Sequence, residues 1–283
     1  MAQALNEAMR EILAGWHHDL DRNWQPMLAG VEPDYDAIDP ALVLEAWEPV
    51  FPPRRGRIYP GAPKGAHMLR GFDGIAPADV RVVILGQDPY PCAAFATGRA
   101  FEAGNVARWR ELEKMFSKSI RTWLQLVVAA RTGDARYAAS VADWDRTIAD
   151  IEAGRVAVEP AAEIMDPWVR QGVLLLNSSF TLSRFQVAGD PHQTDGHLPL
   201  WRLVIAAVLR TLADRGTPTV FMAFGGQAAQ ALAAAGLEEG IHGSNAVILR
   251  EHPAFAEKVL ALENPFLACN AALAALGAAP IGW

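Results

Sequence analysis

The chain has 283 residues, of which 51% are hydrophobic and 20% are charged, an ordinary composition for a globular protein of one large or two small domains. Its formal net charge of −7 argues against indiscriminate binding to nucleic acid, although a local basic groove remains compatible with it. The two cysteines, Cys92 and Cys269, lack metal-ligand spacing and favour a reduced, cytoplasmic setting, and no apolar run approaches the roughly 18 residues that a membrane span needs.

The predicted elements fall into a helical start and a repeating strand–helix pattern. Residues 1–56 are expected to be mostly helical. From residue 80 onward, segments of helical character separate four apolar runs: VRVVIL (80–85), GVLLL (172–176), TVFMAF (219–224) and AVILR (246–250). These runs are continuous rather than alternating, which is typical of strands buried on both faces. The pattern predicts an α/β fold: a single domain over residues 1–283, with a central, mostly parallel four-stranded sheet flanked by helices.

Each apolar run is followed by residues suited to a binding site. The four sequences are GQDPY, NSS, GGQ and EHP, which bring Asp88, Asn177, the pair Gly225–Gly226 and His252. Ligands of parallel α/β folds bind at the carboxyl ends of the strands, so these residues are expected at one rim. Each has a structural alternative, since Asp-Pro is a common turn and Asn often caps a turn. Their joint placement favours a site.

The motifs around these residues resemble those of family 1 uracil-DNA glycosylases, in the family's order. VVILGQDPYP resembles the water-activating motif, with Pro91 where the family usually has His. GVLLLNSSFTL resembles the uracil-reading strand, VFMAFGGQAAQ the third strand and turn, and ILREHPAFA the loop of the catalytic His. The ending NPFLACNAALAALGAAPIGW resembles the C-terminal helix and the family's Pro-Ile-x-Trp finish. The resemblance covers roughly residues 20–283, and the stretch 131–165 is interpreted as an insertion.

The resemblance implies that the chain is a DNA-repair hydrolase that flips uracil out of DNA and cleaves its N-glycosidic bond. Cleavage develops positive charge on the sugar and negative charge on the departing base. Asp88 would position the water and stabilise the cationic sugar, and His252, as neutral imidazole, would donate to uracil O2. Asn177 would read O4 and N3–H of uracil, which cytosine presents in reverse.

The remaining pocket residues follow from the same resemblance. Phe101 would stack on the flipped ring, Tyr90 would stand against C5 and exclude thymine, and the backbone of Gln87 would complete the uracil pocket. Without the motifs, both aromatic residues would be interpreted as core. Neither a cofactor nor a metal is expected, because the spacing of His192 and His197 is not that of a helical ligand pair.

The loop HPAFAE after the strand end departs from the family. Family serines that grip phosphate are replaced by Ala254 and Glu257, and the family leucine that wedges into the base stack is replaced by Ala256. We expect Phe255 to take over the wedge, because inserted apolar side chains unstack DNA elsewhere, and the alternative is that it packs under the loop. An inhibitor protein that mimics DNA and grips that leucine is therefore expected to bind poorly.

The residues expected to contact DNA are Pro253, Ala254, Phe255, Ala256, Lys258, Gly225, Gly226, Arg108 and Arg110. The partner is uracil-containing DNA, and the protein is expected to be a monomer. The sequence leaves open the strand preference and the effect of Pro91. Two other functions also remain open: a slow or non-catalytic binder of uracil or abasic sites, and a small-molecule enzyme with a nucleotide site at Gly225–Gly226.

Overall fold

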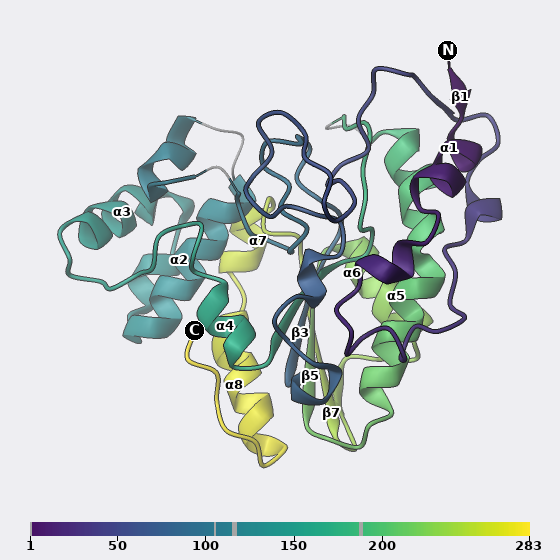
Figure 1. The fold of residues 1–283 in the computed structure, drawn as a ribbon. Coiled ribbons are helices and arrows are strands. Elements are labelled where there is room, and N and C mark those ends of the chain that lie inside the picture. The colour runs from purple at the N-terminus through teal and green to yellow at the C-terminus, as the bar shows by residue number, and fades with distance from the viewer. Residues whose placement is uncertain (1, 105, 115–117, 187–188) are drawn as a thin grey trace.

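In a computed structural model, which describes residues 2–104, 106–114, 118–186 and 189–283, the chain is built around a five-stranded sheet (Figure 1). The strand order is β4–β3–β5–β7–β6. The four parallel strands are β3 (Val82–Gly86), β4 (Val173–Asn177), β5 (Thr219–Phe224) and β7 (Asn245–Arg250). They match the four predicted runs. The edge strand β6 (Gly240–His242) pairs antiparallel with β7; three exposed residues carry too little pattern to be predicted.

The helices cover both faces of the sheet (Figure 1). On one side lie α2 (Lys118–Thr132), α3 (Trp144–Glu152), α4 (Asp166–Arg170), α7 (Ala256–Leu260) and α8 (Pro265–Ala275). On the other side lie α1 (Leu5–Ile12), α5 (Leu198–Ala213) and α6 (Gly226–Ala234). None of the helices described is long and apolar enough to cross a membrane. The predicted α/β class is confirmed.

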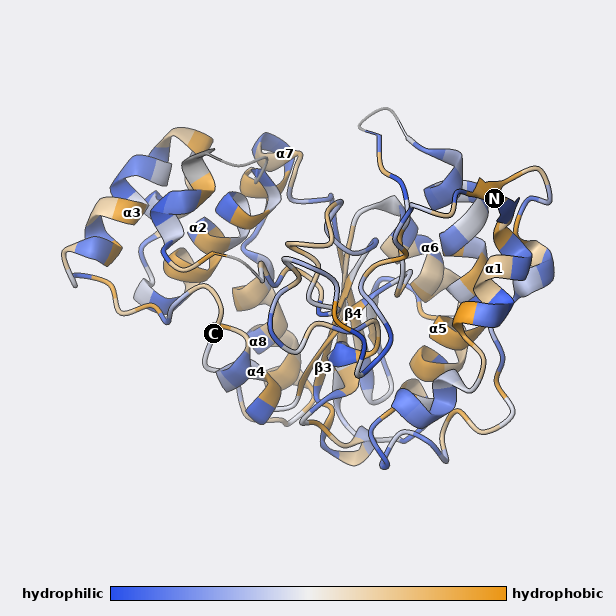
Figure 2. Ribbon diagram, turned by 45° about the horizontal axis from the view of Figure 1, so that its top comes forward, coloured by the Kyte–Doolittle hydropathy of each residue, from blue (hydrophilic) through white to orange (hydrophobic). Residues whose placement is uncertain are grey.

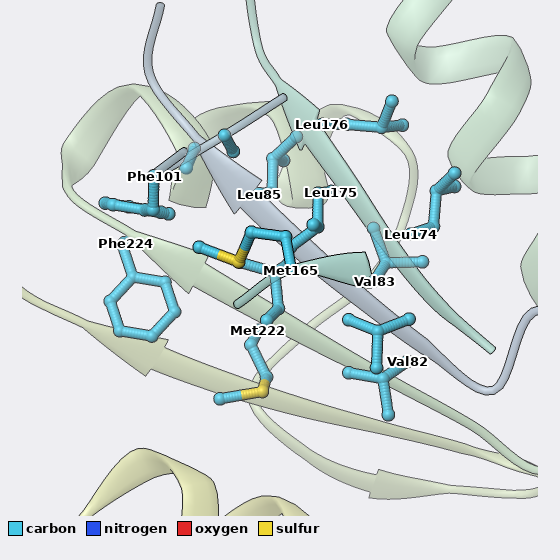
Figure 3. Packing of buried hydrophobic residues seen from close by; sticks show 14 of the residues in the cluster. Val82, Val83, Leu85, Phe101, Met165, Leu174, Leu175, Leu176, Met222 and Phe224 are labelled. Atoms are coloured by element: carbon cyan, nitrogen blue, oxygen red, sulfur yellow. The ribbon is translucent and has the colours of Figure 1, made fainter. Parts of the chain in front are cut away.

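The central strands are buried on both faces, as their continuous apolar runs predict. Every residue of β3, β4 and β5 is buried. Figure 3 shows Val83 and Leu85 of β3 beside Leu175 of β4, with Met222 and Phe224 of β5 in the same cluster. Helices α1 and α3 differ from these strands, because hydrophilic and hydrophobic residues alternate along them (Figure 2). Burial of this apolar area, at about 25 cal/mol per Å², is the main stabilising contribution that holds the strand ends in place.

The expectation that residues 1–56 are mostly helical is wrong. Residues 2–56 contain α1, two 3₁₀ helices (Trp16–Asp19 and Tyr35–Ala37) and the strand pair β1 (Gln3–Ala4) and β2 (Val43–Leu44); the rest is turns and irregular chain. Large buried side chains attach this segment, and Trp24 donates a 2.8 Å hydrogen bond from Nε1 to the carbonyl of Ile75. Tertiary packing, rather than helical periodicity, orders it.

Residues 131–165 form a helical layer around α3 that packs on α2. Gln125 of α2 donates from Nε2 to the carbonyls of Tyr137 (3.0 Å) and Ser140 (2.8 Å). Arg131 forms an ion pair of 2.6 Å with Glu159. That this stretch is an insertion relative to the family stays a prediction.

Candidate active site

A cavity of about 570 Å³ lies at the carboxyl ends of the parallel strands. This volume is in the range that suits a small ligand or a single base. Of the residues predicted for the site, Gln87, Asp88, Tyr90, Phe101, Asn177, Gly225, Gly226, His252, Ala254 and Phe255 line it. The topology explains the gathering: β4, β3, β5 and β7 are adjacent and parallel, so their carboxyl ends meet at one rim.

Asp88 lies two residues after the end of β3 and lines this cavity. Burial raises the pKa of Asp88 from its ordinary value of 3.8 to about 6, and a hydrogen bond from Gln193 opposes that rise. At neutral pH the group is therefore mainly an ionised carboxylate held in a poorly solvated place. Such a charge interacts strongly with a positive charge that develops nearby.

Asn177 ends β4 directly opposite Gly86 of β3, and its side chain lies across that glycine. A Cβ on Gly86 would lie 2.6 Å from Oδ1 of Asn177, so only glycine leaves room for the amide. Ser178 clamps the same strand end, because its backbone N–H and its hydroxyl each donate a 2.9 Å hydrogen bond to the carbonyl of Gly86. Among the described residues, no hydrogen bond uses the Asn177 side-chain amide, which leaves its donor and acceptor for a ligand.

His252 follows β7 and enters the cavity as a neutral imidazole. The backbone N–H of Ala254 donates to Nδ1 at 3.2 Å, so Nδ1 accepts and the ring proton resides on Nε2. Burial lowers the pKa of His252, which keeps it uncharged at neutral pH. Gly225, at φ +95°, lets the neighbouring strand end approach, since a Cβ there would lie 3.1 Å from that of His252.

Phe101 belongs to both the core and the cavity. Its ring stacks on Trp123 of α2 with centroids 4.2 Å apart and planes 7° apart, and Phe224 meets it edge-on at 5.4 Å. Its backbone φ of +61° is a left-handed conformation rare for an aromatic residue. The tertiary structure thus holds the ring rigidly at the cavity wall. The core interpretation is confirmed, and the interpretation that Phe101 stacks on a flipped base stays a prediction.

Tyr90 completes the wall. Its ring is partly buried against the core, and burial raises the pKa of the phenol, which stays uncharged. Pro91 is exposed at the same rim.

The loop after His252 divides into exposed and buried residues. Ala254 and Phe255 are exposed, and 56% of the Phe255 surface is accessible, so it does not pack under the loop. Ala256 begins α7 and is 2% exposed, so its side chain packs into the core, and the prediction that this residue contacts DNA can hold only for its backbone. Pro253 is buried as well, and contacts of Pro253 and Ala256 with DNA stay predictions. Lys258 is exposed, 5.3 Å above the Phe255 ring.

The two arginines predicted to contact phosphate lie outside the cavity lining. Arg110 makes a bidentate ion pair with Glu152 of α3, at 2.8 and 2.7 Å. Arg108 is exposed, 3.5 Å from Glu111. Phosphate would have to compete with Glu152 for Arg110, and both contacts stay predictions.

Several residues of the cavity region escaped the sequence analysis, and four of them bear on the site. Gln193 donates a hydrogen bond to Asp88, Trp123 supports Phe101 from behind, and Phe185 and Lys118 line the cavity. The nearest signal was the pair of histidines around Gln193 in PHQTDGH, which points to no particular partner. Within the described part of the chain, no group of three or more His, Cys, Asp or Glu side chains has the arrangement of a metal site.

Comparison with known proteins identifies relatives of this fold and site. The sequence model of the uracil DNA glycosylase superfamily matches residues 72–274. A uracil-DNA glycosylase of Bordetella petrii is 32% identical over 237 residues, or 80% of this chain and 73% of that protein. One from Parafrankia sp. is 31% identical over 233 residues, 81% and 82% of the two chains. The UNG crystal structure from Nitratifractor salsuginis superimposes with a TM-score of 0.58 at 25% identity, covering 92% of this chain and 95% of that one. The mimivirus uracil-DNA glycosylase structure, 17% identical, shares the fold with a TM-score of 0.59, covering 99% and 93%.

Proposed function

This chain belongs to the uracil DNA glycosylase superfamily and excises uracil from DNA as a repair glycosylase, and we propose that Asp88, Asn177 and His252 carry the reaction in the cavity described above. The single observation that supports this assignment best is their convergence on one cavity from three different strands. The alternative of a small-molecule nucleotide enzyme is set aside, because the matching family and the curated relatives are uracil-DNA glycosylases.

We assign the sugar side of the reaction to Asp88. The bond between the sugar C1′ and uracil N1 breaks with its electron pair going to N1, so that uracil departs as an anion. The oxygen of a water molecule bonds to C1′, and the proton that this water loses passes to the solvent. The partly buried carboxylate stabilises the cationic sugar and orients that water. Because the pKa of Asp88 is about 6, activity should fall as the pH drops through 6 and the charge is lost.

The base side belongs to His252 and Asn177. With the proton on Nε2, neutral His252 donates to uracil O2, where negative charge accumulates as the bond breaks. An imidazolium would require protonation against the burial that lowers its pKa. The Asn177 amide donates to O4 and accepts from N3–H, and a cytosine in the same place would leave both groups unpaired.

The ring itself is held by the aromatic wall. Phe101, fixed by Trp123, stacks on the flipped base, and Tyr90 occupies the space where the thymine methyl would lie. Rigid support behind Phe101 means that little side-chain entropy is lost on binding.

The rim of the cavity is assigned to the DNA strand. We assign Phe255 as the residue that enters the vacated stack, because its exposed ring lines the cavity and Ala256 is buried. A mimivirus UNG variant has been crystallised in complex with UGI. We expect this chain to bind that inhibitor poorly, since no leucine stands in its loop; an inhibition titration with UGI checks this.

The cytoplasmic location, supported by the free thiols of Cys92 and Cys269, and the monomeric state are also proposals.

The test is release of uracil from a single-stranded oligonucleotide with one uracil, measured in single turnover against matched cytosine and thymine strands. Asn177→Asp should lower uracil release at least about tenfold, because the donor to O4 is replaced by a carboxylate. Asn23→Asp, far along the chain on an exposed turn, is the matched control. Undiminished uracil release by Asn177→Asp would remove this residue from the pocket.

A further inference from the structure

The catalytic carboxylate has a partner from a distant part of the chain. Gln193 lies 105 residues from Asp88 in sequence, is only 5% exposed, and donates from Nε2 to Oδ2 of Asp88. An ionised carboxylate only accepts hydrogen bonds, so the NH₂ end of the amide must face it. Gln193 is therefore aimed into the site with a defined orientation.

The segment that carries Gln193 is unusual and tightly held. Residues His192–His197 form a π-helix, a rare conformation that occurs frequently at functional sites. Its start is anchored by Asp190, whose carboxylate accepts from the backbone N–H of His192 (2.9 Å) and whose carbonyl accepts from that of Gln193 (2.9 Å).

Two buried histidines of this segment, His192 and His197, form hydrogen bonds with side chains of the chain that follows β4. Thr181 Oγ1 accepts from Trp201 Nε1 (2.7 Å) and can donate to Nδ1 of His197 (2.9 Å). His197 Nε2–H then donates to Ser183 Oγ (2.9 Å), whose hydroxyl donates to Nδ1 of His192 (2.9 Å). Burial lowers the pKa of His197 to about 3 and also lowers the pKa of His192, which favours the neutral imidazoles that this chain of hydrogen bonds requires. The side chains that form this chain of hydrogen bonds are all buried, which makes the segment rigid.

We propose that Gln193 is a positioning residue for Asp88: its amide holds one carboxylate oxygen so that the other faces the sugar and the water. This inference rests on the proposed function. A neutral donor suits the task, because a cationic partner would cancel the negative charge that the sugar cation needs. A glutamine fixes the geometry and leaves the charge in place.

The charges around the site are compatible with this role. The other ionisable side chains that line the cavity are Tyr90, Arg99, Lys118, Glu251 and His252. Arg99 is engaged by Glu102 and Asp166, and within the described residues no ion pair reaches Asp88. The ionisation of Asp88 is governed by burial, which raises its pKa, and by the hydrogen bond from Gln193, which lowers its pKa.

The experiment is the pH profile of single-turnover uracil release for the wild type, Gln193→Leu and Gln193→Glu. The Leu variant should move the acidic limb upward by about one pH unit, because a hydrogen bond to the charged form is lost. In the Gln193→Glu variant the side chain keeps the shape of glutamine but places a second negative charge beside Asp88, so the acidic limb should move to still higher pH. KM should change little, since the uracil pocket is untouched. Gln230→Leu, on the exposed face of α6, should leave the limb in place.

A second comparison separates this inference from the function on which it rests. In an Asp88→Asn background, Gln193→Leu should have no further effect on the rate, whereas an additive loss would mean that Gln193 acts elsewhere. An acidic limb that stays at the wild-type pH in both Gln193 variants would also overturn the inference, while the proposed function would stand. Wild-type cleavage by Asp88→Asn alone would instead overturn the proposed mechanism. Thermal denaturation identifies variants that fail to fold. If Gln193→Leu is one of them, the isosteric Gln193→Glu variant still tests the inference.

Discussion

Replacing the catalytic carboxylate should make the protein more stable while it becomes inactive. In the folded protein, burial raises the pKa of Asp88 to about 6, against an ordinary value of 3.8 in the unfolded chain. A raised pKa means that the folded state disfavours the charged form, so stability is lost as the pH rises from 3.8 through 6. Asp88→Asn has no charge to bury, and its Oδ1 can still accept from Gln193.

The magnitude follows from the two pKa values. The shift of about 2.2 units corresponds to a destabilisation of the wild type of about 3 kcal/mol at pH 7.5, which shrinks to about 1 kcal/mol at pH 4.5. The assay is urea unfolding of both proteins at these two pH values. At pH 7.5 the variant should unfold at a higher urea concentration than the wild type, and the difference between the two unfolding midpoints should be smaller at pH 4.5.

The control is Asp214→Asn, which changes an exposed carboxylate at the end of α5 and should alter stability little at either pH. If Asp88→Asn is no more stable than the wild type at pH 7.5, the carboxylate is not desolvated and the electrostatic argument for its role fails. If the stability difference between the variant and the wild type did not vary with pH, its cause would be packing rather than the charge of Asp88.

Three further substitutions test the walls of the cavity. Tyr90→Ala should release detectable thymine, because the ring no longer fills the space at C5; complete exclusion of thymine with good uracil cleavage would assign the gate to another residue. Phe255→Ala should reduce cleavage of a U·A duplex well below that of single-stranded DNA, and an equal loss on both substrates would contradict the wedge. Gly86→Ala should lower kcat/KM for uracil at least about tenfold with a stability loss of about 1–3 kcal/mol, because its Cβ displaces the Asn177 amide 2.6 Å away; an unchanged kcat/KM would show that the amide position is not critical.

The sequence determined the four parallel strands of the central sheet and the residues at their carboxyl ends. Strands β3, β4, β5 and β7 were predictable because a strand buried on both faces needs a continuous apolar run, which is a local property. Asp88, Asn177 and His252 were placed at one cavity by the rule that parallel strands end at the same edge.

Only the tertiary structure decided which side chains support that rim. The bond from Gln193 to Asp88 joins residues 105 positions apart, and Trp123 stacks on Phe101 from a helix on the sheet's face. Ala256 is buried although its neighbour Phe255 is exposed, because α7 begins at that residue and turns its first side chain into the core. Such contacts arise from packing between elements distant in sequence, whereas hydrophobic period and turn signals report only on the few residues around each position.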